Sequence, residues 1–195
     1  MTTLFQGNNY INKYFKEAIE NQEVELEFLY GVDWKHKLTK KNFLDVLEYC
    51  KQHYKGLVSK NSLDIRYEFK PGKLSNVRIS IHGIENIKKY CIEDSLDDID
   101  DIEYLQKMYY KNPNEPRFKY IALVDEDYNM KVNLKSEEVL EESDYKIKNV
   151  LSTFGGKKKH FRYKKRFSFE THDKLFRIDL TSVKSTERNR VHRSF

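Results

Sequence analysis

Short stretches in which apolar and polar residues alternate recur along the chain. A period of two is typical of a β-strand whose two faces have different surroundings. The predicted strands are 23–30, 63–69, 76–83, 118–124, 128–134, 159–170 and 175–183. Short polar turns such as Pro71-Gly72 separate the last six of them into pairs. The pattern therefore predicts antiparallel hairpins.

Other segments have the apolar spacing of a helix. They are 8–20, 39–54, 84–91 and 136–150. Strands and helices together predict an α+β fold, in which an antiparallel sheet carries a few helices on its outside. A chain of 195 residues is long enough for one core, so we predict a single domain over residues 1–195.

The sequence carries no sign of membrane insertion or secretion. No apolar run approaches the length of about 18 residues that a membrane span needs. The first residues lack the apolar centre of a signal peptide. Cys50 and Cys91 fall on predicted helices, which favours buried thiols in a reducing compartment over a disulfide or a metal pair. We therefore expect a cytoplasmic protein.

The charge of the chain is unevenly distributed. The formal net charge is +5, but residues 157–195 hold 13 Lys and Arg against 4 Asp and Glu, a net +9. Residues 1–156 are therefore near −4, and 93–103 alone contain seven acids, which we expect on a solvated loop or helix face. A basic segment indicates an anionic partner such as RNA, DNA or a phosphate compound.

The polar faces of the predicted strands are themselves charged. Acids stand at 23, 25 and 27, and Arg or Lys at 78, 131, 162, 164, 166 and 177. Like charges on one strand face repel unless something positive offsets them. An antiparallel sheet with one solvated face explains each pattern separately. A sheet that closes with its polar faces inward would instead form a charged tunnel that has to hold an anion and a cation.

Two motifs resemble those of a known family. Glu25-Leu26-Glu27 followed by FLYG resembles the first glutamate motif of the triphosphate tunnel metalloenzymes. The block RYKKRFSFETHDKLFRIDLTSVKS, 162–185, resembles the basic strand and the R-x-D-x-T strand of the metal-dependent RNA triphosphatases in that family. The similarity is greatest to the RNA triphosphatase domain of mRNA-capping enzymes of large DNA viruses.

The resemblance implies a fold and a reaction. The family fold is a closed antiparallel barrel of about eight strands with helices outside. Its RNA triphosphatases remove the γ-phosphate from the 5′-triphosphate end of nascent mRNA, the first step of cap formation. The resemblance also implies guanylyltransferase and methyltransferase modules as partners, and the host cytoplasm or the virion as the location.

The resemblance assigns roles to individual residues. Glu25 and Glu27 would be ligands of Mg²⁺ or Mn²⁺, because these hard cations prefer carboxylate oxygens. The residues expected to act on the phosphates are Arg162, Lys164, Arg166, Arg177 and Asp179, with Arg78, Lys131 and Thr181 as further substrate-binding residues. Guanidinium and ammonium groups bind phosphate oxygens through charge-assisted hydrogen bonds.

The chain departs from the family after Ser185. There the family has a second glutamate strand, E-x-E-x-E, whereas this chain offers TERNRVHRSF. We therefore expect that the C-terminal glutamate strand is lacking, which keeps other functions open. One is a non-catalytic barrel that binds phosphate or RNA. Another is hydrolysis of tripolyphosphate or nucleoside triphosphates on the same fold.

Overall fold

The structure, a computed structural model, describes residues 9–21, 23–30, 38–115, 117 and 120–186. The chain falls into two compact units. The first contains Met1–Thr39 and Gln106–Glu138, and the second contains Lys40–Leu105 and Val139–Phe195. No helix in the described ranges has both the length and the apolar character to cross a membrane.

The first unit packs one helix against strands. It contains α1 (Asn9–Glu20), β1 (Val24–Tyr30), β6 (Leu123–Asp125), most of β7 (Met130–Leu140) and the second half of β5 (Ile102–Tyr109). β1 pairs antiparallel with β7, from Val24 opposite Ser136 to Tyr30 opposite Met130. Its core has apolar side chains from α1, β1 and β7, among them Tyr14, Val132 and Leu134. Alternation thus sends the apolar positions of β1 and β7 to the helix and their charges to the other face.

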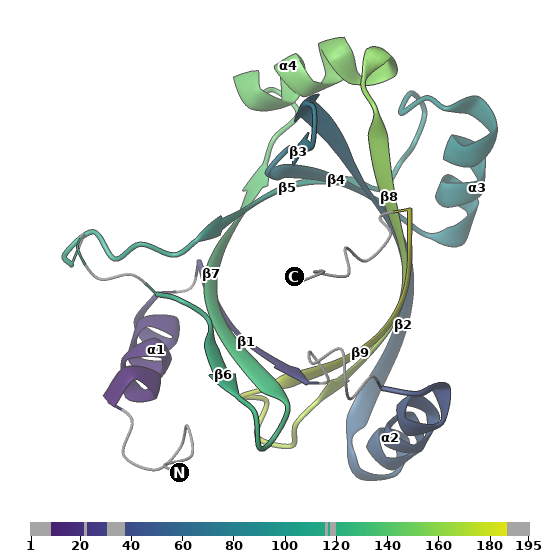
Figure 1. The fold of residues 1–195 in the computed structure, drawn as a ribbon. Coiled ribbons are helices and arrows are strands. Elements are labelled where there is room, and N and C mark those ends of the chain that lie inside the picture. Colours follow the sequence, from purple (N-terminus) through teal and green to yellow (C-terminus); the bar gives the residue numbers. More distant parts are fainter. Residues whose placement is uncertain (1–8, 22, 31–37, 116, 118–119, 187–195) are drawn as a thin grey trace, which may run out of the picture. The chain divides into compact units, whose positions relative to one another are not determined.

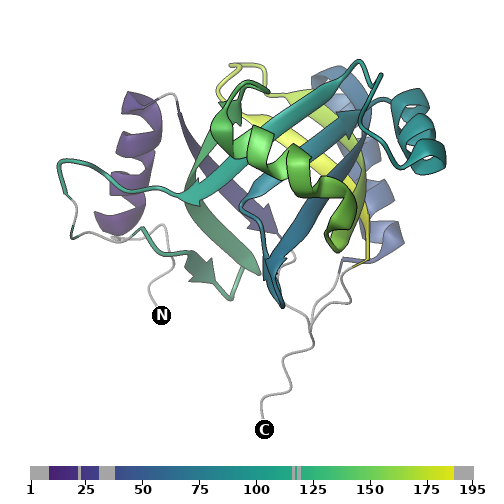
Figure 2. The same cartoon turned by 90° about the horizontal axis from the view of Figure 1, so that it is seen from above.

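The second unit is a sheet covered by helices. Its helices are α2 (Lys40–His53), α3 (Ile84–Glu93), α4 (Tyr145–Thr153) and the short 3-10 helix η1 (Phe154–Gly156). Its further strands are β2 (Lys55–Lys70), β3 (Lys73–Leu74), β4 (Val77–His82), β8 (Lys159–Glu170) and β9 (Arg177–Ser185). β2 pairs antiparallel with both β4 and β8, and β8 pairs with β9. Figure 2 shows α4 lying across the strands of this unit.

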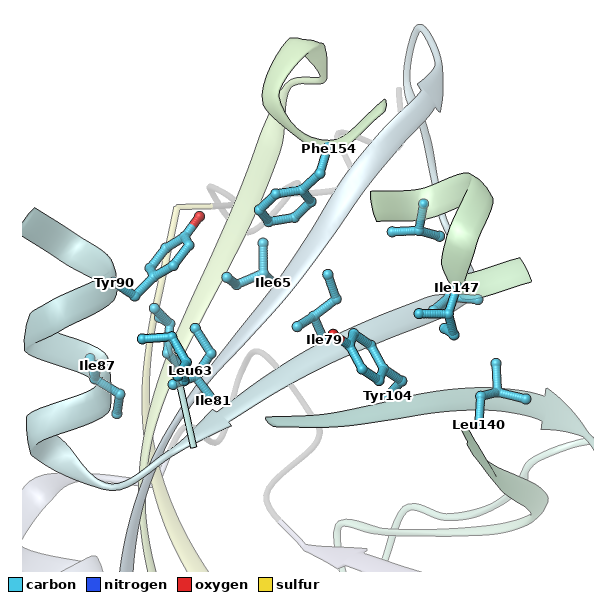
Figure 3. Close-up of a cluster of buried hydrophobic side chains, with 13 residues drawn as sticks. Leu63, Ile65, Ile79, Ile81, Ile87, Tyr90, Tyr104, Leu140, Ile147 and Phe154 are labelled. Atoms are coloured by element: carbon cyan, nitrogen blue, oxygen red, sulfur yellow. The ribbon is translucent and has the colours of Figure 1, made fainter. Parts of the chain in front are cut away.

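The main core of the second unit lies between the sheet and helices α3 and α4. Figure 3 shows Ile65, Ile79 and Ile81 of the strands facing Ile87 of α3 and Ile147 of α4. A second cluster places α2 against the other end of β8, where Phe169 is fully buried. The buried positions alternate with polar ones along each strand, so every helix packs against the same kind of face.

The described strands form one hydrogen-bonded sheet in the order β1-β7-β5-β4-β2-β8-β9 (Figure 1). β3 adds to β2 and β6 adds to β7, and β5 and β7 contribute residues to both units. The fold class predicted from the sequence, an α+β protein with an antiparallel sheet and a few helices outside, is confirmed.

Several sequence predictions need correction, among them the strand predicted at 118–124, where the described residues form a strand only in β6 (Leu123–Asp125). β5 was not predicted, and β2 starts at Lys55 instead of residue 63. The first part of the helix predicted at 136–150 is wrong, because β7 continues to Leu140 and the helix begins at Tyr145. Helix formers such as the two glutamates and the leucine of SEEVL have only a weak preference for the helix, which pairing within a sheet overrides. Cys50 is buried as predicted, but Cys91 is exposed, and both thiols are free.

A partly buried cluster of hydrogen bonds links α1 to the rest of the first unit. The Glu17 carboxylate accepts hydrogen bonds from the hydroxyls of Tyr110 (2.6 Å) and Tyr120 (2.7 Å) and from Asn112 Nδ2 (2.6 Å). Burial on its own would raise the pKa of Glu17, but these donors outweigh it and lower the pKa below the ordinary glutamate value. The charged form of Glu17 therefore stabilises the fold.

Replacing Glu17 with Gln is expected to lower the free energy of unfolding by about 1.5 kcal/mol at neutral pH, since hydrogen bonds to a charged group are lost. Because the folded-state pKa is depressed, this stabilisation is present above the pKa of an unfolded glutamate and is lost as pH falls through the folded pKa. Urea unfolding of both proteins between neutral and acid pH measures it. If the difference in the free energy of unfolding between the two proteins does not change with pH, the charged form of Glu17 does not stabilise the fold.

Candidate functional site

The glutamates of β1 surround a lysine of β5. Lys107 Nζ lies 3.1 Å from Glu25 Oε2 and 2.7 Å from Glu27 Oε1. Glu137 of β7 adds a third carboxylate oxygen at 3.3 Å, and Lys135 Nζ is 3.7 Å from the other oxygen of Glu27. All five side chains are partly buried, and all five residues belong to the first unit. We call Glu25, Glu27 and Glu137 the carboxylate cluster.

Strand register brings this cluster together. Glu25 is opposite Lys135 and Glu27 is opposite Asn133 in the β1–β7 pair. Alternation along β7 then places Glu137 on the same face as Lys135. Lys131, a predicted substrate-binding residue, lies on this face too, opposite Leu29 of β1. Glu25 and Glu27 are thus where the sequence predicts, but Lys107 and Glu137 are additions that only the structure reveals.

The lysine offsets the repulsion between the glutamates. Burial on its own would lower the pKa of Lys107, but the hydrogen bond and charge of Glu27, with the charges of Glu25 and Glu137, raise it above the ordinary lysine value. Lys107 therefore stays an ammonium cation at neutral pH. The like charges on β1 require a positive group among the carboxylates. In this structure that group is the Lys107 ammonium.

The carboxylate cluster fits a divalent cation by its chemistry. Its three carboxylates converge on one positive centre within 3.3 Å, and carboxylate oxygens are the donors that Mg²⁺ and Mn²⁺ prefer. Among the described residues, however, no three acidic or His/Cys side chains are gathered as a ready set of metal ligands. A metal at this position would have to take the place of the Lys107 ammonium.

Replacing Lys107 with Met is expected to lower the free energy of unfolding by about 2–3 kcal/mol, because the half-buried carboxylates lose their counter-charge. Millimolar Mn²⁺ should restore most of this loss, because a ligand that binds only the folded state stabilises it by mass action. Thermal melts with and without Mn²⁺ measure both effects. The triple variant that also carries Glu25→Gln and Glu27→Gln is the control, and equal Mn²⁺ stabilisation of both variants would exclude a cation site here.

A second polar network lies at the centre of the sheet in the second unit. Asp64 of β2 is 1% exposed, and its Oδ2 lies 2.8 Å from Lys164 Nζ of β8. Ser80 of β4 donates a hydrogen bond of 3.0 Å to Asp64 Oδ1, and Arg78 Nε is 3.9 Å from Oδ2. One buried aspartate therefore forms a close ion pair with Lys164 and a longer one with Arg78, and both are predicted phosphate-binding residues.

Burial lowers the pKa of Lys164, and the nearby charges of Arg78 and Arg166 act in the same direction while Asp64 opposes them. Cations are thus crowded around one carboxylate, and an anion added beside them would relieve their repulsion. Arg162 is opposite Asp64 in the β2–β8 register and lies on the same strand face as Lys164. Asp64 belongs to no motif of the sequence, and only the strand register reveals its position.

The third network joins β8 to β9. Asp179 Oδ2 lies 3.3 Å from Arg166 Nη1 and 3.2 Å from Arg177 Nη2. Its other oxygen, Oδ1, is buried and accepts no hydrogen bond from the described residues. Thr181 is opposite Arg166 in the register. The structure therefore brings Arg166, Arg177, Asp179 and Thr181 together, as the R-x-D-x-T pattern predicts.

Comparison with solved structures identifies the fold. A mimivirus capping enzyme triphosphatase superposes with a TM-score of 0.67 at 24% identity, over 94% of this chain and 81% of that chain. The RNA triphosphatase domain of a trifunctional mimivirus mRNA capping enzyme gives 0.66 at 25% identity, with the same coverage. A monoclinic form of the mimivirus enzyme gives 0.65 at 21% identity.

No protein-family model and no curated protein matches this sequence. The structural agreement nevertheless extends over almost the whole chain and concerns the same kind of domain whose motifs the sequence resembles. The resemblance inferred from Glu25-Leu26-Glu27 and residues 162–185 is confirmed, and this chain has the fold of the RNA triphosphatase domain of a viral mRNA-capping enzyme.

Proposed function

We propose that this chain is a metal-dependent RNA 5′-triphosphatase, which removes the γ-phosphate from nascent mRNA as the first step of cap formation. The observation that carries the proposal is the chemistry of the polar strand faces. On the fold of an RNA triphosphatase, they present a carboxylate cluster and two networks of cations held by aspartates. A triphosphate needs both kinds of group, because its hydrolysis depends mainly on positioning and charge stabilisation.

The cations of the second unit would bind the phosphate oxygens. Lys164 and Arg166 lie two residues apart on one face of β8, and their aspartate partners fix where each charge points. Arg162 extends this row, and Arg78 adds a guanidinium beside Lys164. Fixed cations that need no rearrangement stabilise the charge that develops on the phosphate during the reaction.

Hydrolysis transfers the γ-phosphoryl group to water. The water oxygen forms a bond to the γ-phosphorus, the bond to the β–γ bridging oxygen breaks, and the products are inorganic phosphate and a 5′-diphosphate end. Asp179 would orient the attacking water, and its Oδ1 accepts no hydrogen bond from the described residues. Arg177 and Arg166 hold that carboxylate in place.

Glu25 and Glu27, with Glu137, would hold Mg²⁺ or Mn²⁺. When bound, the ion neutralises triphosphate charge and orients the γ-phosphate. These three residues supply hard oxygen donors on one face of adjacent strands. Lys131 lies on the same face of β7 and would add a contact to the substrate.

The proposed reaction also implies partners. One of the solved neighbours is described as part of a trifunctional mRNA capping enzyme. We therefore propose guanylyltransferase and methyltransferase modules as partners, of which the guanylyltransferase uses the 5′-diphosphate product, and we propose that the chain acts in the host cytoplasm or the virion.

One observation favours a second candidate, a barrel that binds RNA without hydrolysing it. The Lys107 ammonium occupies the centre of the carboxylate cluster, so the cluster can be stable without a metal. Binding would then come from phosphate contacts and would weaken steeply with salt.

Phosphate release separates these functions. The full chain is assayed on RNA with a 5′-triphosphate, on tripolyphosphate and on ATP, with Mg²⁺, with Mn²⁺ or with EDTA. We expect release from RNA that requires the metal and exceeds release from the other two substrates. Preference for tripolyphosphate or ATP would assign another activity of the same fold. RNA binding without release from any substrate would identify the binding protein.

A further inference from the structure

The row of basic side chains on the polar face of β8 is longer than a triphosphate. The row runs from His160 through Arg162 and Lys164 to Arg166. Residues two apart on a strand are separated by about 6.7 Å, so the whole row extends over about 20 Å. Three phosphates joined by single bridging oxygens are shorter than this. One end of the row is therefore available to a further anion.

The proposed reaction gives the substrate a direction along this row. Asp179, which would orient the attacking water, has its Oδ2 3.3 Å from Arg166 Nη1. The γ-phosphate would therefore lie at the Arg166 end, and the α-phosphate would lie toward Arg162. Since RNA is attached to the α-phosphate, it would continue toward His160 and the start of β8. This step rests on the proposed function, because the position of the attacking water distinguishes the two ends.

Basic side chains gather at that end of the row. We call Arg66, Lys70, Lys73, Lys158 and His160 the basic rim. Arg66 is opposite His160 in the β2–β8 register, and Lys158 directly precedes β8. Lys70 and Lys73 are opposite each other where β2 pairs with β3. All five residues belong to the second unit, and the three lysines are exposed to solvent.

One carboxylate positions two members of the basic rim. Glu68 Oε1 lies 3.0 Å from Lys158 Nζ and 2.9 Å from His160 Nε2. Hydrogen bonds from Lys158 and His160 lower the pKa of Glu68 below the ordinary glutamate value, so Glu68 is charged at neutral pH. It is the only acid in the segments 66–75 and 158–160. The rim therefore keeps an excess of positive charge.

The other members of the rim also suit an anionic chain. Lys70 and Lys73 are like charges directly opposite each other, a destabilising arrangement that a nearby anion would offset. Arg66 Nε donates a hydrogen bond of 2.9 Å to the Ser75 carbonyl oxygen, which ties this guanidinium to the segment before β4. Positive charge spread along a path, and not gathered in one closed pocket, is typical of a surface that follows a single-stranded phosphate backbone.

We propose that the basic rim binds the phosphodiester groups of the nucleotides that follow the 5′-triphosphate. The substrate then lies along β8, with its γ-phosphate near Asp179 and its RNA chain leaving the sheet beside Lys158. Contacts to the sugar-phosphate backbone do not read the bases, so this surface accepts transcripts of any 5′ sequence.

The salt dependence of RNA binding tests the rim. The rim variant is Lys70→Gln/Lys73→Gln/Lys158→Gln. The matched control, Lys41→Gln/Lys51→Gln/Lys88→Gln, removes three exposed lysines on helices α2 and α3. An RNA of about ten nucleotides, with a 5′-triphosphate and a 3′ fluorophore, is titrated with each full chain in EDTA, and binding is followed by fluorescence anisotropy. The titrations cover about 50 to 200 mM NaCl.

The rim variant is expected to bind this RNA about tenfold more weakly than the wild type at the lowest salt concentration. Each lost phosphate contact makes the plot of log affinity against log salt less steep by about 0.7, so three lost contacts should reduce the slope by about 2. The control should have the affinity and the slope of the wild type. Equal slopes for the wild type and the rim variant would overturn the proposal.

Photo-crosslinking of the unchanged chain tests the direction of the RNA and does not depend on any variant folding. The RNA carries 4-thiouridine as its second nucleotide, and mass spectrometry identifies the peptides that become attached to it. We expect attachment within residues 66–75 or 158–160. Attachment confined to residues 166–179, at the other end of β8, would reverse the direction and overturn the proposal.

Phosphate release from the same RNA with Mg²⁺ or Mn²⁺ separates this inference from the proposed function. If no phosphate is released but the rim variant has the smaller salt slope, the reaction is absent and the rim is still an RNA-binding surface. If phosphate is released and the two slopes are equal, the proposed reaction stands and the rim does not bind RNA.

Discussion

Replacing Asp64 with Ala is expected to lower the free energy of unfolding by about 3–5 kcal/mol, because it leaves a buried cation without its partner. Lys164 is 9% exposed and its Nζ lies 2.8 Å from the Asp64 carboxylate. Arg78 shares this carboxylate at 3.9 Å. Urea unfolding measures the loss. RNA hydrolysis by the protein that remains folded should also fall, since Lys164 and Arg78 lose the group that positions them.

Two other variants show whether the charge is the cause. Ser80→Ala removes only the hydrogen bond to Asp64 Oδ1 and should cost about 1 kcal/mol. The double variant Asp64→Leu/Lys164→Met removes both charges and should be more stable than Asp64→Ala, because no unpaired ammonium remains buried. A double variant that is less stable than Asp64→Ala would show that packing, not charge, governs this site.

The double variant Glu25→Gln/Glu27→Gln is expected to lower the rate of γ-phosphate release by at least about 10³-fold, because the charge that holds the metal is removed and with it several kcal/mol of transition-state stabilisation. Folding should be largely retained. The Gln oxygens can still accept hydrogen bonds from Lys107, and Glu137 keeps its charge beside it.

The matched control is Glu48→Gln/Glu85→Gln, two exposed glutamates on helices α2 and α3. It changes the formal charge equally and should leave the rate unchanged. Release is followed as inorganic phosphate at saturating metal, with circular dichroism as the check of folding. If the Glu25→Gln/Glu27→Gln variant retains a tenth or more of the wild-type rate, Glu25 and Glu27 are not ligands of the metal.

The motifs near the two ends of the sheet could be predicted because they are local. Glu25 and Glu27 alternate on one strand, and Arg177, Asp179 and Thr181 alternate on another. Their side chains share a face as soon as the strand forms. The contact between Arg166 and Asp179 then follows from the hairpin between β8 and β9.

Residues whose role depends on distant pairing could not be predicted in this way. Lys107 stands in IEYLQKMY, where alternation is poor and the preceding acids favour a loop, yet it lies beside glutamates about 80 residues earlier in the chain. Glu137 falls in a segment of helix-forming residues. In the sequence, Asp64 is one polar position among several. Its place between Ser80 and Arg162 is known only from the register of the strands. These positions are fixed by strand order, which a single sequence does not determine.

The structure also changes how the like charges of β1 are explained. The sequence predicts a metal among the glutamates, and the structure places the Lys107 ammonium there. A metal ion and the Lys107 ammonium would each offset the repulsion between the glutamates. The carboxylate cluster can therefore be stable without a bound metal. Mn²⁺ stabilisation of the Lys107→Met variant therefore tests whether the two cations use the same carboxylates.

The 5′ end of the RNA after one turnover shows whether the chain hydrolyses a 5′-triphosphate. A short RNA with a 5′-triphosphate is incubated with excess full chain and Mg²⁺ or Mn²⁺, and the mass of the RNA is then measured. We expect a product that is one phosphate lighter, with a 5′-diphosphate end, and no product in EDTA. Recovery of the unchanged triphosphate from RNA that the chain has bound would contradict it and would identify a binding protein.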